Sequence, residues 1–205
     1  MTITAKDIQT LRHTTGSGMM DAKRALEEAG GDMARAADIL REKGIAQVAK
    51  RSERVAAEGA IGSYLHQQAG RPVIGVLVEL ASETDFVAKS EDFRRVANDI
   101  AMHIAAARPS WVRSEDVPDT ILEKERQLSA AAARNEGKPE QVIDKIVDGR
   151  LKKYVEDNVL YEQPFVRTEV YEGTVGDMLR QLAVTMGENI SVVRFTRLQV
   201  GESAA

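Results

Sequence analysis

The sequence predicts an α+β fold: a bundle of three short helices, then a small antiparallel sheet packed with helices and carrying a projecting antiparallel helical hairpin. Three observations support this prediction. Residues 1–44 place apolar side chains at helical spacing between glycine breaks. The segment A-G-R-P (69–72) separates two β-rich runs, which is typical of a strand hairpin. The segment E-G-K-P (136–139) separates two charged helical runs, which is typical of a helical hairpin.

Residues 1–44 are predicted to form the three-helix bundle. Thr4 and Asp7 provide a capping pattern for the first helix. Glycines end the second helix at 30–31, and Asp32 begins a third helix, which we expect to stop at Gly44. The side chains expected to face the core of the bundle are Ile8, Leu11, Ala22, Ala25, Leu26, Met33, Ala36, Ile39 and Leu40.

Met19 and Met20 lie at the start of the second helix. Adjacent helical residues point in different directions, so we expect one of the two to face the core and the other to be exposed. An exposed Met is an adaptable contact for a partner protein, although a partly covered surface Met is an equally good interpretation. The segment T-G-S-G-M-M (15–20) lacks the G-K-[ST] ending of a phosphate-binding loop, so we interpret its glycines as a turn.

Residues 45–57 are predicted to form a linker helix. Between Arg41 and Arg54, five positive and two negative side chains give a net charge of +3. Such a run could contact RNA, but a solvated helix face is the commoner explanation. No aromatic side chains lie among these charges, which weakens the case for nucleic acid.

Residues 58–205 are predicted to form the α+β domain. Strands at 61–67 and 73–81 form the hairpin, and a third strand at 190–200 joins it. A helix from about Ser90 to just before Pro109 packs on the strands through Phe93, Val96, Ile100 and Ile104.

A projecting helical hairpin is expected at about 114–158. Pro118 and Pro139 fit the first turns of its two helices. The apolar seam between these helices is expected to contain Ile121, Leu128, Ala132, Ile143, Val147 and Tyr154. A last helix follows, capped by Thr174 and Asp177 and closed by Gly187.

The segment E-T-D-F-V-A-K (83–89) connects the second strand to the next helix. An aromatic residue flanked by Asp is unusual there, because such connections lie on the surface. The commoner interpretation is that Phe86 packs beneath the following helix. The alternative is an aromatic anchor offered to a partner.

Composition limits the possible functions. The chain has 205 residues, a net charge of −4 and no cysteine, which excludes disulfides and thiolate metal sites and fits a reducing cytoplasm. We find no secretory signal and no apolar run near the roughly 20 residues of a membrane-spanning helix.

The histidines at 13, 66 and 103 show no metal-ligand spacing, and His103 is expected to be a satisfied packing or surface residue. Catalytic motifs are absent, so the sequence favours a binding protein without a cofactor over an enzyme.

Several segments resemble bacterial translation elongation factor Ts, in family order along nearly the whole chain. They are T-G-S-G-M-M-D-A-K-R-A-L-E-E-A-G-G-D near the start, T-D-F-V-A (84–88), D-I-A-M-H-I-A-A (99–106), E-G-K-P (136–139), G-R-L-K-K-Y (149–154) and Q-P-F-V (163–166). The N-terminal bundle resembles the ubiquitin-associated-like module that opens these proteins. Longer members carry two copies of the central α/β unit, whereas this chain has length for one.

The resemblance implies a guanine nucleotide exchange factor for elongation factor Tu, which accelerates release of GDP so that GTP can bind. In the family, T-D-F-V disturbs the magnesium site of that GTPase. The resemblance therefore implies the same role for the matching residues Thr84, Asp85, Phe86 and Val87. Met19 and Met20 are weaker candidates for partner contact. A form with one central unit is expected to need a non-covalent homodimer, and neither a membrane nor direct nucleic-acid binding is expected.

Two other functions remain open at this point. A ubiquitin-associated-like adaptor would bind some other protein through the bundle alone. A ribosome- or RNA-binding factor would use Lys50–Arg51 and Lys152–Lys153, and its RNA affinity would fall steeply with salt. Neither alternative explains T-D-F-V-A.

Overall fold

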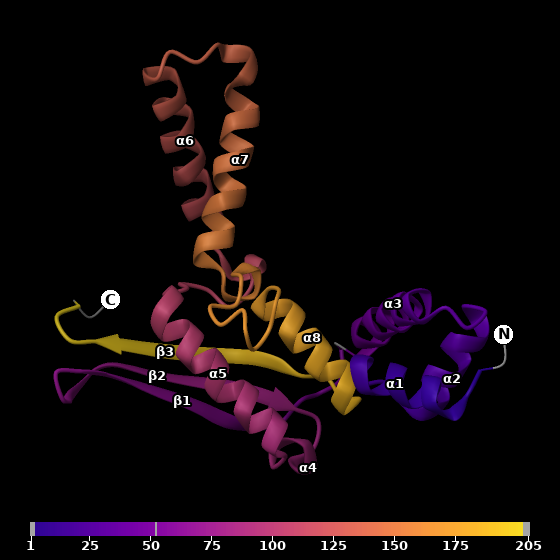
Figure 1. The fold of residues 1–205 in the computed structure, drawn as a ribbon. Coiled ribbons are helices and arrows are strands. Elements are labelled where there is room, and N and C mark those ends of the chain that lie inside the picture. The colour runs from indigo at the N-terminus through magenta and orange to yellow at the C-terminus, as the bar shows by residue number, and fades with distance from the viewer. Residues whose placement is uncertain (1–2, 52, 203–205) are drawn as a thin grey trace. The chain divides into compact units, whose positions relative to one another are not determined.

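The computed structural model describes residues 3–51 and 53–202 (Figure 1). It confirms the predicted α+β class, because helices accompany a small three-stranded antiparallel sheet. The described residues form two compact units, which we treat separately. Unit 1 lies within 1–60, 81–93 and 179–191, and unit 2 lies within 61–80, 94–178 and 192–205.

The N-terminal bundle of unit 1 consists of α1 (Ala5–Thr15), α2 (Met19–Glu28) and α3 (Met33–Arg51). The predicted cap of α1 is confirmed: the Asp7 amide donates to Thr4 Oγ1 over 3.2 Å, and the Thr4 amide donates to Asp7 Oδ2 over 2.9 Å. Asp32 accepts the amides of residues 34 and 35 at the start of α3. The buried core comprises Leu11, Ala22, Ala25, Leu26, Ala29, Ala36 and Leu40, with Ile8, Met33 and Ile39 partly buried against it.

The third helix does not stop at Gly44, as we expected from the sequence, but continues to Arg51. Glycine inside a helix costs about 1 kcal/mol relative to alanine, which tertiary packing can offset. A Cβ at position 44 would lie 3.0 Å from a methyl carbon of Val184, so the glycine permits close packing. The predicted linker helix is therefore the end of α3, and residues 53–57 form a turn and irregular chain; Ser52 lies outside the described residues.

The sheet has the order β1–β2–β3, formed by β1 (Glu58–Gln68), β2 (Arg71–Ser82) and β3 (Ser191–Gln199). Ala69 and Gly70 both have positive φ (50° and 78°), as in the two-residue turns that suit the twist of a hairpin. Arg71 and Pro72, predicted to be in the turn, already belong to β2.

Helix α5 (Glu91–Ala107) comes after β2 in the chain, where a helix was predicted, and buries Phe93, Val96, Ile100 and Ile104. Within unit 2 it passes very close to β1: a Cβ on Gly62 would lie 2.2 Å from the backbone oxygen of Ala97. Val76 and Val78 are buried in β2, whereas alternate strand positions leave large apolar side chains exposed. These exposed residues are Ile61, Leu65, Leu77 and Leu198 in the strands and Val200 directly after β3, which together we call the apolar sheet face.

The predicted helical hairpin consists of α6 (Asp119–Asn135) and α7 (Glu140–Asn158), which run side by side in Figure 1. Short 3-10 turns flank it at η1 (Ser114–Asp116) and η2 (Leu160–Glu162). Pro118 and Pro139 lie at the N-cap positions of the two helices, one residue before the predicted first turns.

The seam of the hairpin differs from our prediction on α6. Ile143 and Val147 are buried as expected, but their fully buried partner on α6 is Ala133, and Leu128 is 54% exposed. The run S-A-A-A-A (129–133) allows α6 to approach α7 closely through small side chains, which leaves the bulkier Leu128 outside the contact. Periodicity could not show which alanine of the run would be buried.

Within unit 2, two of the motifs found in the sequence lie in contact: D-I-A-M-H-I-A-A (99–106) and Q-P-F-V (163–166). His103 is fully buried, and its ring stacks on Phe165 with centroids 5.6 Å apart. The amide of Val166 donates to His103 Nδ1 over 3.2 Å, so Nε2 carries the proton and donates to Gln163 Oε1 over 2.9 Å. Gln163 in turn donates to the backbone oxygen of Asp157 over 2.7 Å. The expectation of a satisfied packing histidine is confirmed.

The last helix, α8 (Val175–Met186), has the predicted cap, because the Asp177 amide donates to Thr174 Oγ1 over 3.1 Å. Gly187 follows it with a φ of 75°. Glu188 and Asn189 come next in the chain, just before β3, and both belong to unit 1.

Candidate functional site

The T-D-F-V segment forms a short helical turn, α4 (Asp85–Ala88), directly after β2. Thr84 is its N-cap: its backbone is extended, and its side chain accepts the amide of Val87 over 3.4 Å. The Ser82 hydroxyl donates to the backbone oxygen of Thr84 over 3.0 Å. The segment is therefore a capped turn with a defined direction.

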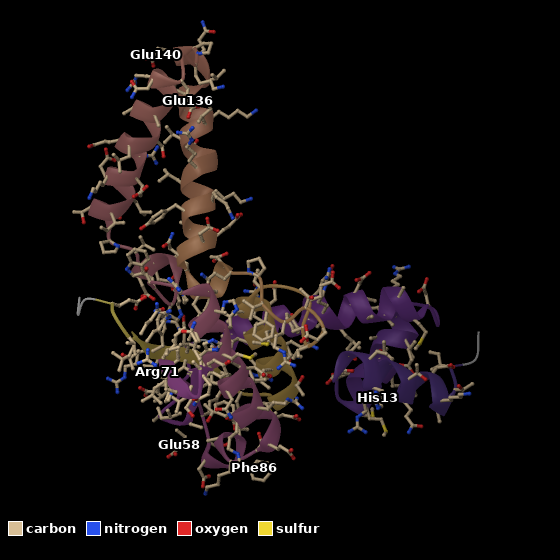
Figure 2. All side chains as sticks on the ribbon, turned by 60° about the vertical axis from the view of Figure 1, so that its left-hand side comes forward. His13, Glu58, Arg71, Phe86, Glu136 and Glu140 are labelled. Atoms are coloured by element: carbon tan, nitrogen blue, oxygen red, sulfur yellow. The ribbon has the colours of Figure 1, made fainter. Side chains whose placement is uncertain are left out.

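Phe86 is 82% exposed, whereas Val87 is 5% exposed and Ala88 is also buried. Figure 2 shows Phe86 projecting away from the ribbon. The interpretation that Phe86 packs beneath the next helix is thus wrong, and Val87 occupies the buried position instead. Burying a Phe side chain contributes about 1.5–3 kcal/mol, so covering this exposed ring in an interface would contribute free energy of that size to binding.

Asp85 lies beside the exposed ring and pairs with Lys89 one turn later, at 2.5 Å. The hydrogen bond from Lys89, aided by its positive charge, lowers the pKa of the Asp85 carboxyl. Asp85 therefore stays ionised at neutral pH and is well exposed. The turn therefore exposes an aromatic ring at Phe86 and, at Asp85, an ionised carboxylate paired with Lys89.

A second segment, distant in the sequence and not among the predicted site residues, holds the start of this turn. The Glu188 carboxylate accepts the amides of Glu83 and Thr84, over 3.0 and 3.1 Å, and the Thr84 hydroxyl over 2.5 Å. The Glu83 carboxylate accepts the amide of Asn189 over 2.7 Å. From the sequence we interpreted Gly187 as the end of a helix and assigned no role to Glu188 or Asn189, because a partner more than 100 residues away leaves no spacing signal.

Met19 and Met20 begin α2 and are both exposed, at 59% and 63%. The expectation that one of them would face the core is wrong. Ala22, Ala25 and Leu26 fill the core face of this helix, and the first turn extends beyond the core. The bundle therefore offers two adjacent thioether side chains to solvent.

The basic pairs that would favour an RNA-binding factor are largely matched by acidic or polar neighbours. Lys152 and Lys153 lie 3.8 and 2.7 Å from Glu156 and Asp157, each one helical turn away. Arg51 donates to Gln47 over 3.3 Å. Within residues 3–51 and 53–202, no three His, Asp or Glu side chains are grouped as metal ligands. In the same residues, every helix is too short or too polar to cross a membrane.

Comparison with known proteins gives one consistent result. The family model described as "Elongation factor TS" matches residues 4–202. The elongation factor Ts of Carboxydothermus hydrogenoformans is 51% identical over 203 residues, covering 99% of this chain and 91% of that protein. Those of Alkaliphilus oremlandii and Thermosipho melanesiensis are 52% and 49% identical, covering 98% of this chain and 91% and 100% of the relatives. These relatives are thus of similar length to this chain. The chain belongs to the elongation factor Ts family, the nucleotide exchange factors of elongation factor Tu.

Proposed function

We propose that this protein accelerates release of GDP from elongation factor Tu by inserting Phe86 into the GTPase, so that GTP can bind. It acts in the cytoplasm and has no covalent chemistry of its own. The observation that carries the mechanism is the 82% exposure of Phe86 on a capped turn whose neighbours Val87 and Ala88 are buried. Exposing an aromatic ring to water is unfavourable, so a ring held in this way is suited to insertion into a pocket of a partner protein.

The magnesium ion of the GTPase is the proposed point of action. Magnesium requires near-ideal octahedral geometry at short distances, so a small displacement of its ligands weakens the bound nucleotide strongly. Phe86 acts as the wedge that displaces the elements holding the ion, and Asp85 adds a negative charge beside it. Thr84 and Val87 serve within the same segment, Thr84 as its cap and Val87 as its buried support.

Linkage sets how much binding energy the exchange factor needs. If the exchange factor lowers the affinity of the GTPase for nucleotide, bound nucleotide lowers the affinity of the GTPase for the exchange factor by the same ratio. A thousandfold effect corresponds to about 4 kcal/mol, whereas one buried Phe supplies about 1.5–3 kcal/mol. Further contacts are therefore required, and the exposed Met19 and Met20 on the bundle are our candidates.

A homodimer is the second part of the proposal. Five large apolar side chains of the sheet region, Ile61, Leu65, Leu77, Leu198 and Val200, are exposed in the single chain. Large exposed apolar surfaces are uncommon on monomeric proteins and mark interaction sites. A second copy of the chain, packed face to face through the apolar sheet face, would cover these side chains without any covalent link.

The direct test follows release of a fluorescent GDP from elongation factor Tu by stopped flow. The wild-type protein should accelerate release, and Phe86→Ala should slow the accelerated rate by about 10- to 100-fold, the equivalent of the lost Phe burial. Val55→Ala is a matched control, because Val55 is also 82% exposed and lies in the same unit. Circular dichroism should show both variants folded. No acceleration by the wild type would overturn the proposed function, and equal rates for wild type and Phe86→Ala would remove Phe86 from the mechanism.

A further inference from the structure

Glu188 contacts the T-D-F-V segment through three hydrogen bonds to two consecutive residues. Its Oε2 accepts the backbone amides of Glu83 and Thr84 at 3.0 and 3.1 Å, and its Oε1 accepts the Thr84 hydroxyl at 2.5 Å. Hydrogen bonds to a charged acceptor are about twice as strong as neutral ones. One carboxylate therefore fixes both the backbone and the capping side chain at the point where α4 begins.

The contact is reciprocal. The Glu83 carboxylate accepts the amide of Asn189 at 2.7 Å, so each glutamate binds the backbone of the other segment. We call this arrangement the carboxylate clamp, formed by Glu83 and Glu188. Arg54 lies 3.4 Å from Glu83, which offsets the repulsion of two nearby negative charges. The Asn189 side chain donates to the backbone oxygen of Arg54 over 2.8 Å, which ties a third part of the chain to the clamp.

The turn needs such external support. Helix α4 has four residues, and isolated helices of that length are unstable because nucleation is costly. Phe86 lies two residues beyond Thr84 and is 82% exposed, so its ring makes little contribution to holding the turn. The direction of the ring is therefore set by the hydrogen bonds at the start of the turn together with the buried Val87 and Ala88 that follow it.

We propose that Glu188 is a positioning residue for nucleotide exchange: it holds the T-D-F-V turn in the conformation that presents Phe86. This inference rests on the proposed exchange function. A ring fixed before binding loses less conformational entropy on insertion, which raises the effectiveness of the contact. Glu188 itself need not touch elongation factor Tu.

The first arm of the test needs no partner. Amide hydrogen exchange by NMR should show the Glu83 and Thr84 amides losing protection by about tenfold or more in Glu188→Ala, since a charged acceptor is lost. Glu188→Gln keeps an acceptor oxygen without the charge and should give intermediate protection. The exposed Glu172→Ala is the control and should leave both amides unchanged. Wild-type protection of both amides in a folded Glu188 variant overturns the proposal.

The second arm measures GDP release in a double-mutant cycle with Phe86→Ala. Glu188→Ala should slow accelerated release by about tenfold in the wild-type background, Glu188→Gln should slow it less, and Glu188→Ala should have almost no effect once Phe86 is removed. Equal slowing in both backgrounds would show that Glu188 does not act through Phe86. If the wild type fails to accelerate release, the proposed function falls, while the amide measurement still decides whether the clamp exists. If Glu188→Ala does not fold, Glu188→Gln provides both readouts.

Discussion

The phenylalanines of this chain show how one residue type takes opposite roles. Phe93 and Phe165 are buried, whereas Phe86 is exposed beside a buried Val87. An exposed side chain contributes little to stability, so Phe86→Ala should change the free energy of unfolding by less than about 0.5 kcal/mol. Loss of exchange activity in that variant would then report on binding and not on folding.

We expect His103 to make the free energy of unfolding depend on pH. Burial lowers the pKa of its imidazole below the ordinary value of 6.5, and the Gln163 hydrogen bond opposes this only in part. In the window between the folded pKa and 6.5 the unfolded chain binds more protons, so stability is fully present above about pH 6.5 and is lost as the pH falls. Urea unfolding at pH 7.5 and 5.5 should show this loss.

His103→Gln is the matched variant for the pH measurement. It removes the titrating ring but keeps a polar side chain near Gln163 and the Val166 amide. The difference in unfolding free energy between the two pH values should be smaller in this variant. The same difference in both proteins would show that the pH dependence comes from other groups.

Local signals in the sequence were sufficient for most elements but not for the site. Capping at Thr4 and Thr174, and the apolar spacing of α5, act between residues close in the chain, so the corresponding helices could be predicted. The clamp could not, because Glu188 and Thr84 are 104 residues apart. The sequence left open whether Phe86 packs inward or faces a partner, because its exposure depends on how Val87 packs, which only the fold reveals.

At the scale of elements, glycines decide how closely helices and strands approach. Gly62 lets α5 lie against β1, where a Cβ would be 2.2 Å from a backbone oxygen. Gly149 is in the interior of α7, and a Cβ there would meet no atom within 4 Å. Replacing glycine by alanine is therefore expected to change the stability of the protein in opposite directions at the two positions.

Gly62→Ala should destabilise the protein by about 1–3 kcal/mol or more, because the backbone of α5 or β1 must shift. Gly149→Ala should stabilise it by about 0.5–1 kcal/mol, since alanine is the better helix former. Denaturant midpoints with unchanged m-values would measure both. Destabilisation by both substitutions would contradict the open surroundings of Gly149, and tolerance of Gly62→Ala would contradict the close approach of α5.

At the scale of the whole molecule, the apolar sheet face predicts the oligomeric state. Light scattering should give a mass of about twice the 22.5 kDa of one chain. Leu77→Asp places a charge on this face, where Leu77 is exposed in the single chain, and should shift the mass to that of a monomer. Leu128→Asp on the hairpin is the control, because Leu128 is similarly exposed. A wild-type monomer at working concentration would count against the dimer.

The most direct test of the central claim compares GDP release with and without magnesium, using saturating wild-type protein and Phe86→Ala. If Phe86 acts by displacing the ligands of the magnesium ion, chelating the ion removes the step that Phe86 accelerates. The release rates with the two proteins should then differ by about 10- to 100-fold with magnesium, and this difference should largely disappear in excess chelator. A difference of the same size under both conditions would contradict the account and place the action of Phe86 elsewhere on the GTPase.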